Sequence, residues 1–366
     1  MKPRMFNSIR YIALLIIVMV PALVQAQHAP QAPCPPAAPA AGPLVKVVGP
    51  EFLAMLSHQG PHINQNQDAE AAYDSEKRKT FEKIYKVSSS DMLSIENKFG
   101  KVHINTWDKN EIKVQVNIIT RASSEQKAQE ILDNISISDK REGKLIALKT
   151  IMEPMRISGN TQKSFEINYT VYMPDDNPIA VKNSFGDVYL AAFKGKADIS
   201  VKYGSLKTGR LNNSANSVKL AYGSGNCGYI NGGNIEVSYS DMTLEGTNGL
   251  QGFSKFSDFK LGSLNQDLDM EVKYGSFRID NVSKNIRKIN LESGFSPISL
   301  NFEDNTAFNF NVNVQFGNFR VDKELVNITS LEKSHTSAEY KGKYGSTSPK
   351  GLVSIVSKYG DVKFTR

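Results

Sequence analysis

Four aspartates stand at the same offset behind an aromatic residue, and they are the side chains of this sequence best suited to chemistry: Asp187, Asp241, Asp258 and Asp361. Two carboxylates at a set separation, in different environments, can act as general acid and base on a glycosidic bond. Asp241 and Asp258 would lie about 5 Å apart if consecutive segments pair as neighbouring parallel strands. A polysaccharide-active enzyme is one interpretation of this pattern.

Serines fill the same offset elsewhere and favour a structural role for it: Ser205, Ser224, Ser276 and Ser346. Aspartate and serine both cap turns through hydrogen bonds from the side chain to the backbone, whereas serine does not replace a catalytic carboxylate. The pattern therefore favours turn capping. We predict that the protein is not an enzyme and has no catalytic residues.

The histidines and cysteines form no metal-binding pattern. Three of the five histidines lie in the first 62 residues, and His103 and His335 are isolated, so no HxxxH spacing occurs. Cys34 and Cys227 are too far apart in the sequence to form a disulfide framework. We expect Cys34 to be an exposed thiol and Cys227 a small buried residue. The sequence predicts no metal and no cofactor.

The N-terminus has the pattern of a secretory signal peptide over residues 1–26. Basic residues precede an apolar run from Tyr11 to Val24, and small residues precede a cleavage site before Gln27. The run is shorter than the roughly 20 residues that cross a bilayer, which disfavours a retained anchor, and no later stretch is long enough. We expect export to the periplasm or the cell surface. The net charge of +7 is too mild to indicate nucleic acid.

Residues 27–80 are rich in Pro and Ala and then in polar residues, which is typical of a linker. Apolar residues alternate with polar ones beyond residue 80 and predict strands. A Ser N-cap and helix-forming residues predict one helix at about 123–135. We expect 81–178 to be a β-rich leader with the first coil, in which 120–178 forms an insertion or cap, and 179–366 to hold the repeats.

An aromatic residue followed by Gly or Ser recurs at steps of 15 to 28 residues, mostly 17 to 21. Nearly constant steps predict an all-β parallel solenoid of roughly ten coils, with each aromatic at the same corner. An antiparallel sandwich is the alternative. Glycine after the aromatic would supply a positive-φ bend, and the rings would stack about 4.8 Å apart. The corner residues are Phe185, Gly186, Tyr203, Gly204, Tyr222, Gly223, Tyr239, Phe256, Tyr274, Gly275, Phe295, Phe316, Gly317, Tyr344, Gly345, Tyr359 and Gly360.

Lysine often precedes the corner aromatic, at Lys98 and at Lys202, Lys255, Lys273, Lys343 and Lys358. Stacked coils would bring Lys255 next to Lys273, and Lys343 next to Lys358, and neighbouring aspartates would relieve the repulsion. One interpretation is that these lysines only form a solvated face of the protein. The other interpretation is that they form a basic stripe beside aromatic rings, which binds an anionic glycan through many weak, salt-sensitive contacts.

The phrases "FGDVYL", "YGSLKT", "YGSFRI" and "YGDVKF" follow a signal peptide and a β-rich leader. In these features the chain resembles the bacterial putative adhesin family of β-solenoid domains, common in Bacteroidetes envelopes, over residues 90–366. The resemblance implies a binding role and no catalytic residues. We expect an exported binding module for an anionic glycan or another envelope surface; the alternative is a periplasmic module that docks an envelope protein. The oligomeric state is left open.

Overall fold

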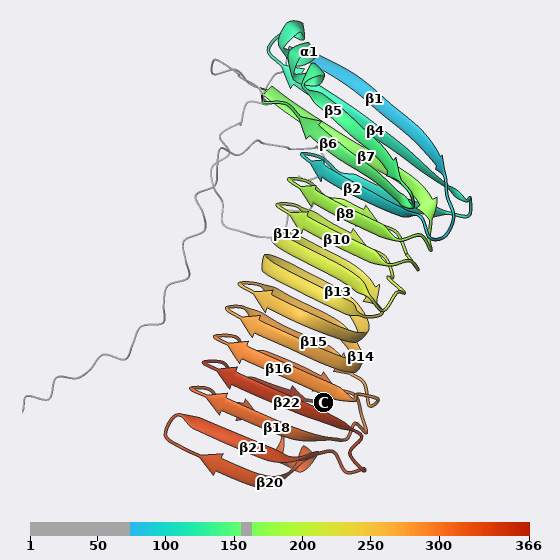
Figure 1. Ribbon diagram of the computed structural model, residues 1–366. Helices are drawn as coiled ribbons and strands as arrows, with labels where there is room; N and C mark the ends of the chain where they lie inside the picture. Colours follow the sequence, from blue (N-terminus) through green and yellow to red (C-terminus); the bar gives the residue numbers. More distant parts are fainter. Residues whose placement is uncertain (1–73, 155–162) are drawn as a thin grey trace, which may run out of the picture. The chain divides into compact units, whose positions relative to one another are not determined.

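The computed structural model describes residues 74–154 and 163–366, and about two thirds of these residues lie in strands of one 23-stranded sheet (Figure 1). The all-β prediction is confirmed. The predicted signal peptide, Cys34 and most of the predicted linker lie outside the described residues. The linker range was too long at its C-terminal end, because strand β1 (Ser75–Lys86) begins within it.

At the N-terminal end of the sheet the strands pair antiparallel. β4 (Glu111–Ala122) lies between β1 and β7 (Lys163–Pro174), and β5 (Ile135–Glu142) pairs with β6 (Leu145–Met152). Alternate residues of β4 are fully buried, including Val114 and Val116, which gives this strand one face towards the core. The helix α1 (Glu125–Asp133) packs against β1 and β4. Its N-cap is Ser124, so the predicted helix is confirmed, although it is shorter than 123–135.

Two parallel rows of strands follow, one on each side of the aromatic corner. The row before the corner contains β2 (Met92–Lys98), β8 (Ile179–Ser184), β10 (Ala197–Lys202) and β16 (Lys288–Gly294). The row after it contains β3 (Val102–Trp107), β9 (Val188–Leu190), β11 (Ser205–Thr208), β15 (Ser276–Val282) and β17 (Ile298–Phe302). Three long strands belong to both rows: β12 (Asn216–Ile230), β13 (Gly233–Lys255) and β14 (Asp258–Lys273).

The end of the chain is inserted between earlier strands. β22 (Gly351–Lys358) pairs in parallel with β16 on one side and with β18 (Phe308–Gln315) on the other, as Figure 1 shows. β23 (Val362–Thr365) likewise lies between β17 and β19 (Phe319–Arg320). Beyond β18 the sheet ends with β21 (Ser337–Tyr344) and β20 (Val326–Lys333), which are antiparallel and follow a 3-10 turn at Lys323–Leu325. The last residues of the chain are therefore not at the end of the sheet.

Residues 120–178 do not form a separate insertion, which corrects the prediction. β6 pairs in parallel with β2, and β7 pairs in parallel with β3, so both continue the stacked rows. The elements that cover this end are β1, β4, α1 and β5. The apolar residues that point inward from both rows form one continuous core.

Candidate binding surface along the aromatic corner

The corner aromatics form one ladder of stacked rings. Ring centroids of neighbouring layers are 4.6–5.1 Å apart with planes within 8° of parallel, in the order Phe99, Phe185, Tyr203, Tyr222, Tyr239, Phe256, Tyr274, Phe295, Tyr359 and Phe316. The edge of Phe165 covers the Phe99 end. The predicted stacking at this corner is confirmed, and Phe99 extends the ladder by one ring before Phe185.

The bend at the corner is made by the aromatic residue and not by the glycine, contrary to the expectation. All ten ladder residues have φ between 51° and 61°, a left-handed conformation that costs a non-glycine residue about 1–2 kcal/mol. Gly204 is needed for space: a Cβ there would lie 2.1 Å from the carbonyl oxygen of Gly186 in the preceding layer. Where serine replaces this glycine, as at Ser257, the hydroxyl accepts the N–H of the layer before it, from Ser240.

Tyr344 is not a corner residue, and its assignment to the repeat is wrong. It lies on the antiparallel strand β21, is buried, and stacks on Phe308 within the core. The positive φ there belongs to Gly345. The layer that completes the ladder is that of Tyr359, whose ring lies between those of Phe295 and Phe316.

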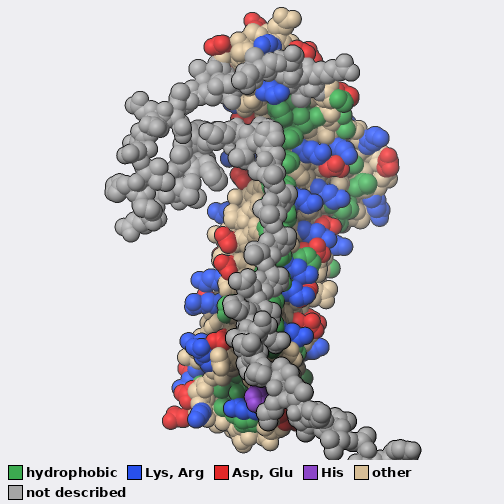
Figure 2. Space-filling view, turned by 90° about the vertical axis from the view of Figure 1, so that its left-hand side faces the viewer, with side chains coloured by type: hydrophobic (Ala, Val, Ile, Leu, Met, Phe, Trp, Pro, Cys, Tyr) green, Lys and Arg blue, Asp and Glu red, His purple; other side chains and the backbone are tan. Residues whose placement is uncertain are grey.

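Part of the ladder lies at the surface of the described residues. Several of its rings are about half exposed, between 43% and 54%: Phe185, Tyr203, Tyr359 and Phe316. Figure 2 faces the side where β16 and β22 end, and it shows a narrow vertical band of hydrophobic side chains with Lys and Arg beside it. Because each ring inside the ladder is stacked on both faces, only its edge can contact a ligand.

Lysines lie beside the ladder in some layers only, so they do not form a continuous stripe. The register runs Lys98–Ser184–Lys202–Ala221, and later Lys255–Lys273–Gly294–Lys358–Gln315. Lys255 and Lys273 are neighbours as predicted. Lys343 does not lie next to Lys358 as predicted, because it belongs to the antiparallel strand β21 and faces Asn309 and Asn327. Across the described residues no ion pair engages Lys98, Lys202 or Lys358.

Glu271 relieves the repulsion between the two adjacent lysines. Its carboxylate pairs with Lys273 and, at 2.9 Å, with the ammonium group of Lys255. The hydrogen bonds from Lys273 and Lys255 lower the pKa of Glu271 below its ordinary value, and the bond to Glu271 raises that of Lys273. The neutralising residue is thus a glutamate two positions before Lys273 on the same face, where we expected aspartates.

Three of the four aspartates at the shared offset cap the backbone of the next layer. A carboxylate oxygen of Asp187 accepts the backbone N–H of Ser205 (2.9 Å), and Asp258 accepts both the N–H and the hydroxyl of Ser276 (3.0 and 2.6 Å). Asp361 accepts the N–H of Asn318 (2.9 Å), and this bond lowers its pKa. Asp241 and Asp258 are in register on adjacent layers. These bonds cap the backbone of a neighbouring layer and favour a structural role, but they are not the bonds within one turn that the sequence predicted.

Cys227 is fully buried, as predicted, and burial raises the pKa of its thiol to about 11. Within residues 74–154 and 163–366, no three His, Cys, Asp or Glu side chains gather as a metal site would require. No helix in the same ranges is long and apolar enough to cross a bilayer.

A second ladder, of asparagine side chains, was missed in the sequence. The amide of Asn265 donates to Asn248 (3.1 Å), that of Asn248 to Asn231 (2.6 Å), and that of Asn231 to the carbonyl of Asn212 (2.9 Å). These asparagines are 19, 17 and 17 residues apart, the same steps as the aromatics nine positions before them. That shared spacing is the signal that could have found them.

The chain matches no family model and no curated protein. Among solved structures it is similar to a putative adhesin from Parabacteroides merdae (9% identity, 79% of this chain and 97% of that one, TM-score 0.36). It is also similar to a putative adhesin from Bacteroides fragilis (10%, 78% and 97%, TM-score 0.32). A third is a putative lipid binding protein from Parabacteroides distasonis (11%, 78% and 97%, TM-score 0.34). The structural neighbours thus include putative adhesins, the family that the repeats resemble.

Proposed function

We propose that the chain is an exported, non-catalytic binding module built as a parallel β-solenoid of about ten coils, whose aromatic corner binds an anionic glycan of the cell envelope. The parallel register, the ladder of ten rings and the asparagine ladder support the solenoid. We place the protein in the periplasm or at the cell surface. The capping role of the aspartates supports the absence of catalysis.

The ring ladder, about half exposed at four of its ten rings, carries this proposal together with the lysines beside it that no ion pair engages among the described residues. An extended polymer can lie along the ladder and meet an equivalent ring edge in every layer, so that weak contacts add up to avidity. Lys202 and Lys358 supply exposed positive charge at the ends of their strands, next to Tyr203 and Tyr359. Because these charges are in water, binding is expected to weaken as salt rises.

The test is binding of residues 27–366 to acidic and neutral envelope glycans at low and high salt. The informative variant changes Lys98, Lys202 and Lys358 to Gln. A matched variant changes Lys207, Lys260 and Lys363 to Gln. These lysines lie on the row after the corner, so this variant tests the loss of positive charge alone. We expect salt-sensitive binding of acidic glycans that only the first variant loses. Binding lost equally in both variants, or absent, would refute the proposal and favour docking of an envelope protein.

A further inference from the structure

The outer face of the antiparallel sheet β1–β4–β7 contains a polar hollow that the aromatic ladder does not use. In register, Arg78 faces Ile119, and Asn117 lies between Thr80 and Asn168. These residues line a hollow of about 270 Å³. Three strands that are far apart in the sequence thus bring an arginine, two amides and an apolar side chain to one place.

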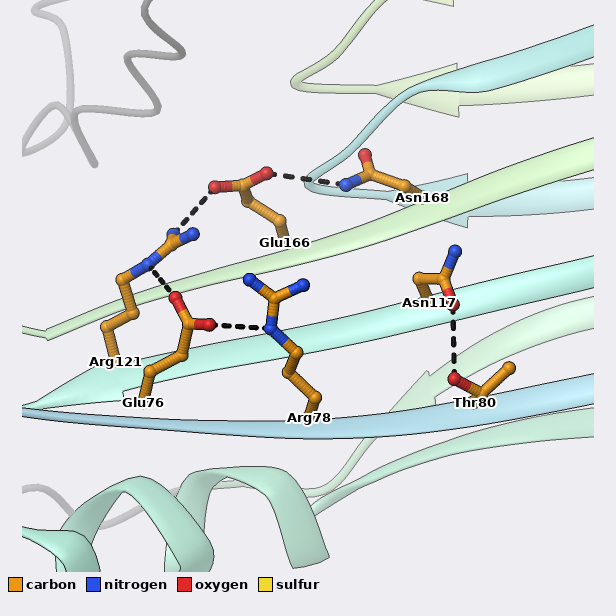
Figure 3. Close-up of polar contacts among 7 residues, drawn as sticks. All are labelled: Glu76, Arg78, Thr80, Asn117, Arg121, Glu166 and Asn168. Atoms are coloured by element: carbon orange, nitrogen blue, oxygen red, sulfur yellow. Dashed lines mark hydrogen bonds and ion pairs between the residues drawn. The ribbon is translucent and has the colours of Figure 1, made fainter.

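The two amide groups are held in fixed orientations. The hydroxyl of Thr80 donates to the side-chain oxygen of Asn117 (3.1 Å), which leaves the NH2 group of Asn117 free to donate. The backbone N–H of Lys101 donates to the oxygen of Asn168 (2.8 Å), and the NH2 group of Asn168 donates to Glu166 (3.3 Å). Figure 3 shows the amides of Asn117 and Asn168 on neighbouring strands.

A relay of charged side chains positions Arg78. Glu166 accepts from one end of Arg121 (2.8 Å), Arg121 donates its Nε–H to Glu76 (2.7 Å), and Glu76 accepts the Nε–H of Arg78 (2.6 Å; Figure 3). Burial opposes the charge of Arg121, but its bonds to Glu166 and Glu76 raise its pKa. The bond from Arg78 lowers the pKa of Glu76. Both carboxylates, those of Glu76 and Glu166, are therefore occupied by the two arginines.

The relay uses only the Nε–H of Arg78. Among the described residues no partner engages its two terminal nitrogens, and a guanidinium fork of this kind matches a carboxylate in a bidentate pair. The free amide of Asn117 adds donors for an oxygen of the same ligand, and the apolar side chain of Ile119 can pack against a ring.

We propose that this hollow binds the carboxylate-bearing sugar residue of an acidic saccharide, with the carboxylate on Arg78 and a ring hydroxyl on Asn117. The inference rests on the proposed function only for the class of ligand. It concerns one sugar unit, whereas the ladder requires a polymer. Failure at one surface is therefore distinguishable from failure at the other.

The experiment titrates the mature chain with glucuronate, glucose and acetate by NMR or calorimetry. Glucuronate should bind saturably and more tightly than acetate, and glucose should not bind. Arg78→Gln and Arg78→Lys should each weaken binding about tenfold or more, because Lys cannot form the bidentate pair. Arg278→Gln is the matched control, since Arg278 is equally exposed and also contacts an acid, Asp280.

Three outcomes would overturn the inference. Glucuronate fails to bind; or Arg78→Gln binds it as well as Arg278→Gln does; or acetate binds as tightly as glucuronate, which would make the hollow a site for any small carboxylate. Arg78 is largely exposed, so the variants are expected to fold, and circular dichroism with an unchanged unfolding midpoint checks this. Asn117→Ala, which keeps Arg78, should lower affinity several-fold without abolishing binding.

Discussion

The ring of Tyr359 stacks on that of Phe295, with centroids 4.6 Å apart and planes 5° apart, although 64 residues separate them in the sequence. Their strands are in register, with Lys358 opposite Gly294. The strand β22, near the end of the sequence, thus lies between β16 and β18 and completes the sheet there. The stacking of Tyr359 on both neighbours holds this closure.

Replacing Tyr359 with Ala should therefore destabilise the fold. The change removes two stacked pairs, each worth about 0.5–1.5 kcal/mol, so the free energy of unfolding should fall by roughly 1–3 kcal/mol. Tyr359→Phe keeps both stacks and should change little. Urea unfolding of the three proteins measures this, and equal stability of the Ala and Phe variants would show that stacking contributes nothing.

Gly204→Ala should be costly for a different reason. The new Cβ would meet the carbonyl oxygen of Gly186 at 2.1 Å, so a layer must shift; overpacking of this kind costs about 1–3 kcal/mol. At Gly294 the nearest atom to a new Cβ is 3.6 Å away, and Gly294→Ala should cost little or stabilise slightly. If thermal unfolding gave the same midpoint for both variants, the close approach of the layers would be wrong.

Glu271→Gln separates the two interpretations of the lysines. It leaves Lys255 beside Lys273 without their shared acid, which should cost about 0.2–1 kcal/mol because the pair is at the surface. The same change should strengthen binding of an anionic glycan, since it frees two positive charges near Phe256 and Tyr274. Glu245→Gln, on the other row, is the control for net charge. Unchanged or equally raised affinity in both variants would argue for a solvated face only.

The same carboxylate predicts a pH dependence. The pKa of Glu271 is lower in the folded chain than its ordinary value of 4.5, so its contribution to stability is present above that value. It should be lost as the pH falls through the lowered folded pKa. Compared with wild type, Glu271→Gln should lose less stability between pH 6 and low pH. Parallel stability–pH curves for the two proteins would contradict the ion pair.

Cys227 should resist alkylation in the folded protein. Its thiol is buried, and with a pKa of about 11 it is protonated at neutral pH, whereas the thiolate is the reactive form. A Cys34→Ser variant of the mature chain should react with iodoacetamide only after unfolding in urea. Because the folded pKa is raised, stability should also fall as the pH rises from about 9 towards 11. Fast modification without urea would contradict the burial.

The sequence predicts those features that repeat locally. Tyr203 and Tyr222 have the same local sequence pattern and the repeat spacing between them, so their stacking could be expected from the sequence alone. Tyr344 and Tyr359 lie in nearly identical tetrapeptides, "KYGS" and "KYGD", yet only Tyr359 joins the ladder. The strands that end at Tyr344 and just before Tyr359 both pair with β18, β22 in parallel and β21 antiparallel, and the direction in which remote strands pair leaves no local mark in the sequence.

The candidate surfaces also differ in how much of them the sequence predicts. Lysines beside the aromatics were visible from the spacing, and so was the contact of Lys255 with Lys273. Their shared partner Glu271 could have been found from the two-residue alternation of a strand. The hollow at Arg78 could not, because it is built from the pairing of β1, β4 and β7, and β1 lies partly within a range whose composition predicted a linker.

The most direct test of binding at the aromatic corner is hydroxyl-radical footprinting of residues 27–366, with and without a bound acidic glycan. Tyr203 and Tyr359 are 44% and 47% exposed, and Tyr172, on the outer face of β7 and outside the ladder, is 39% exposed. The account predicts that the glycan slows oxidation of Tyr203 and Tyr359 and leaves Tyr172 unchanged. Protection of Tyr172 alone, or of none of the three under saturating glycan, would contradict it.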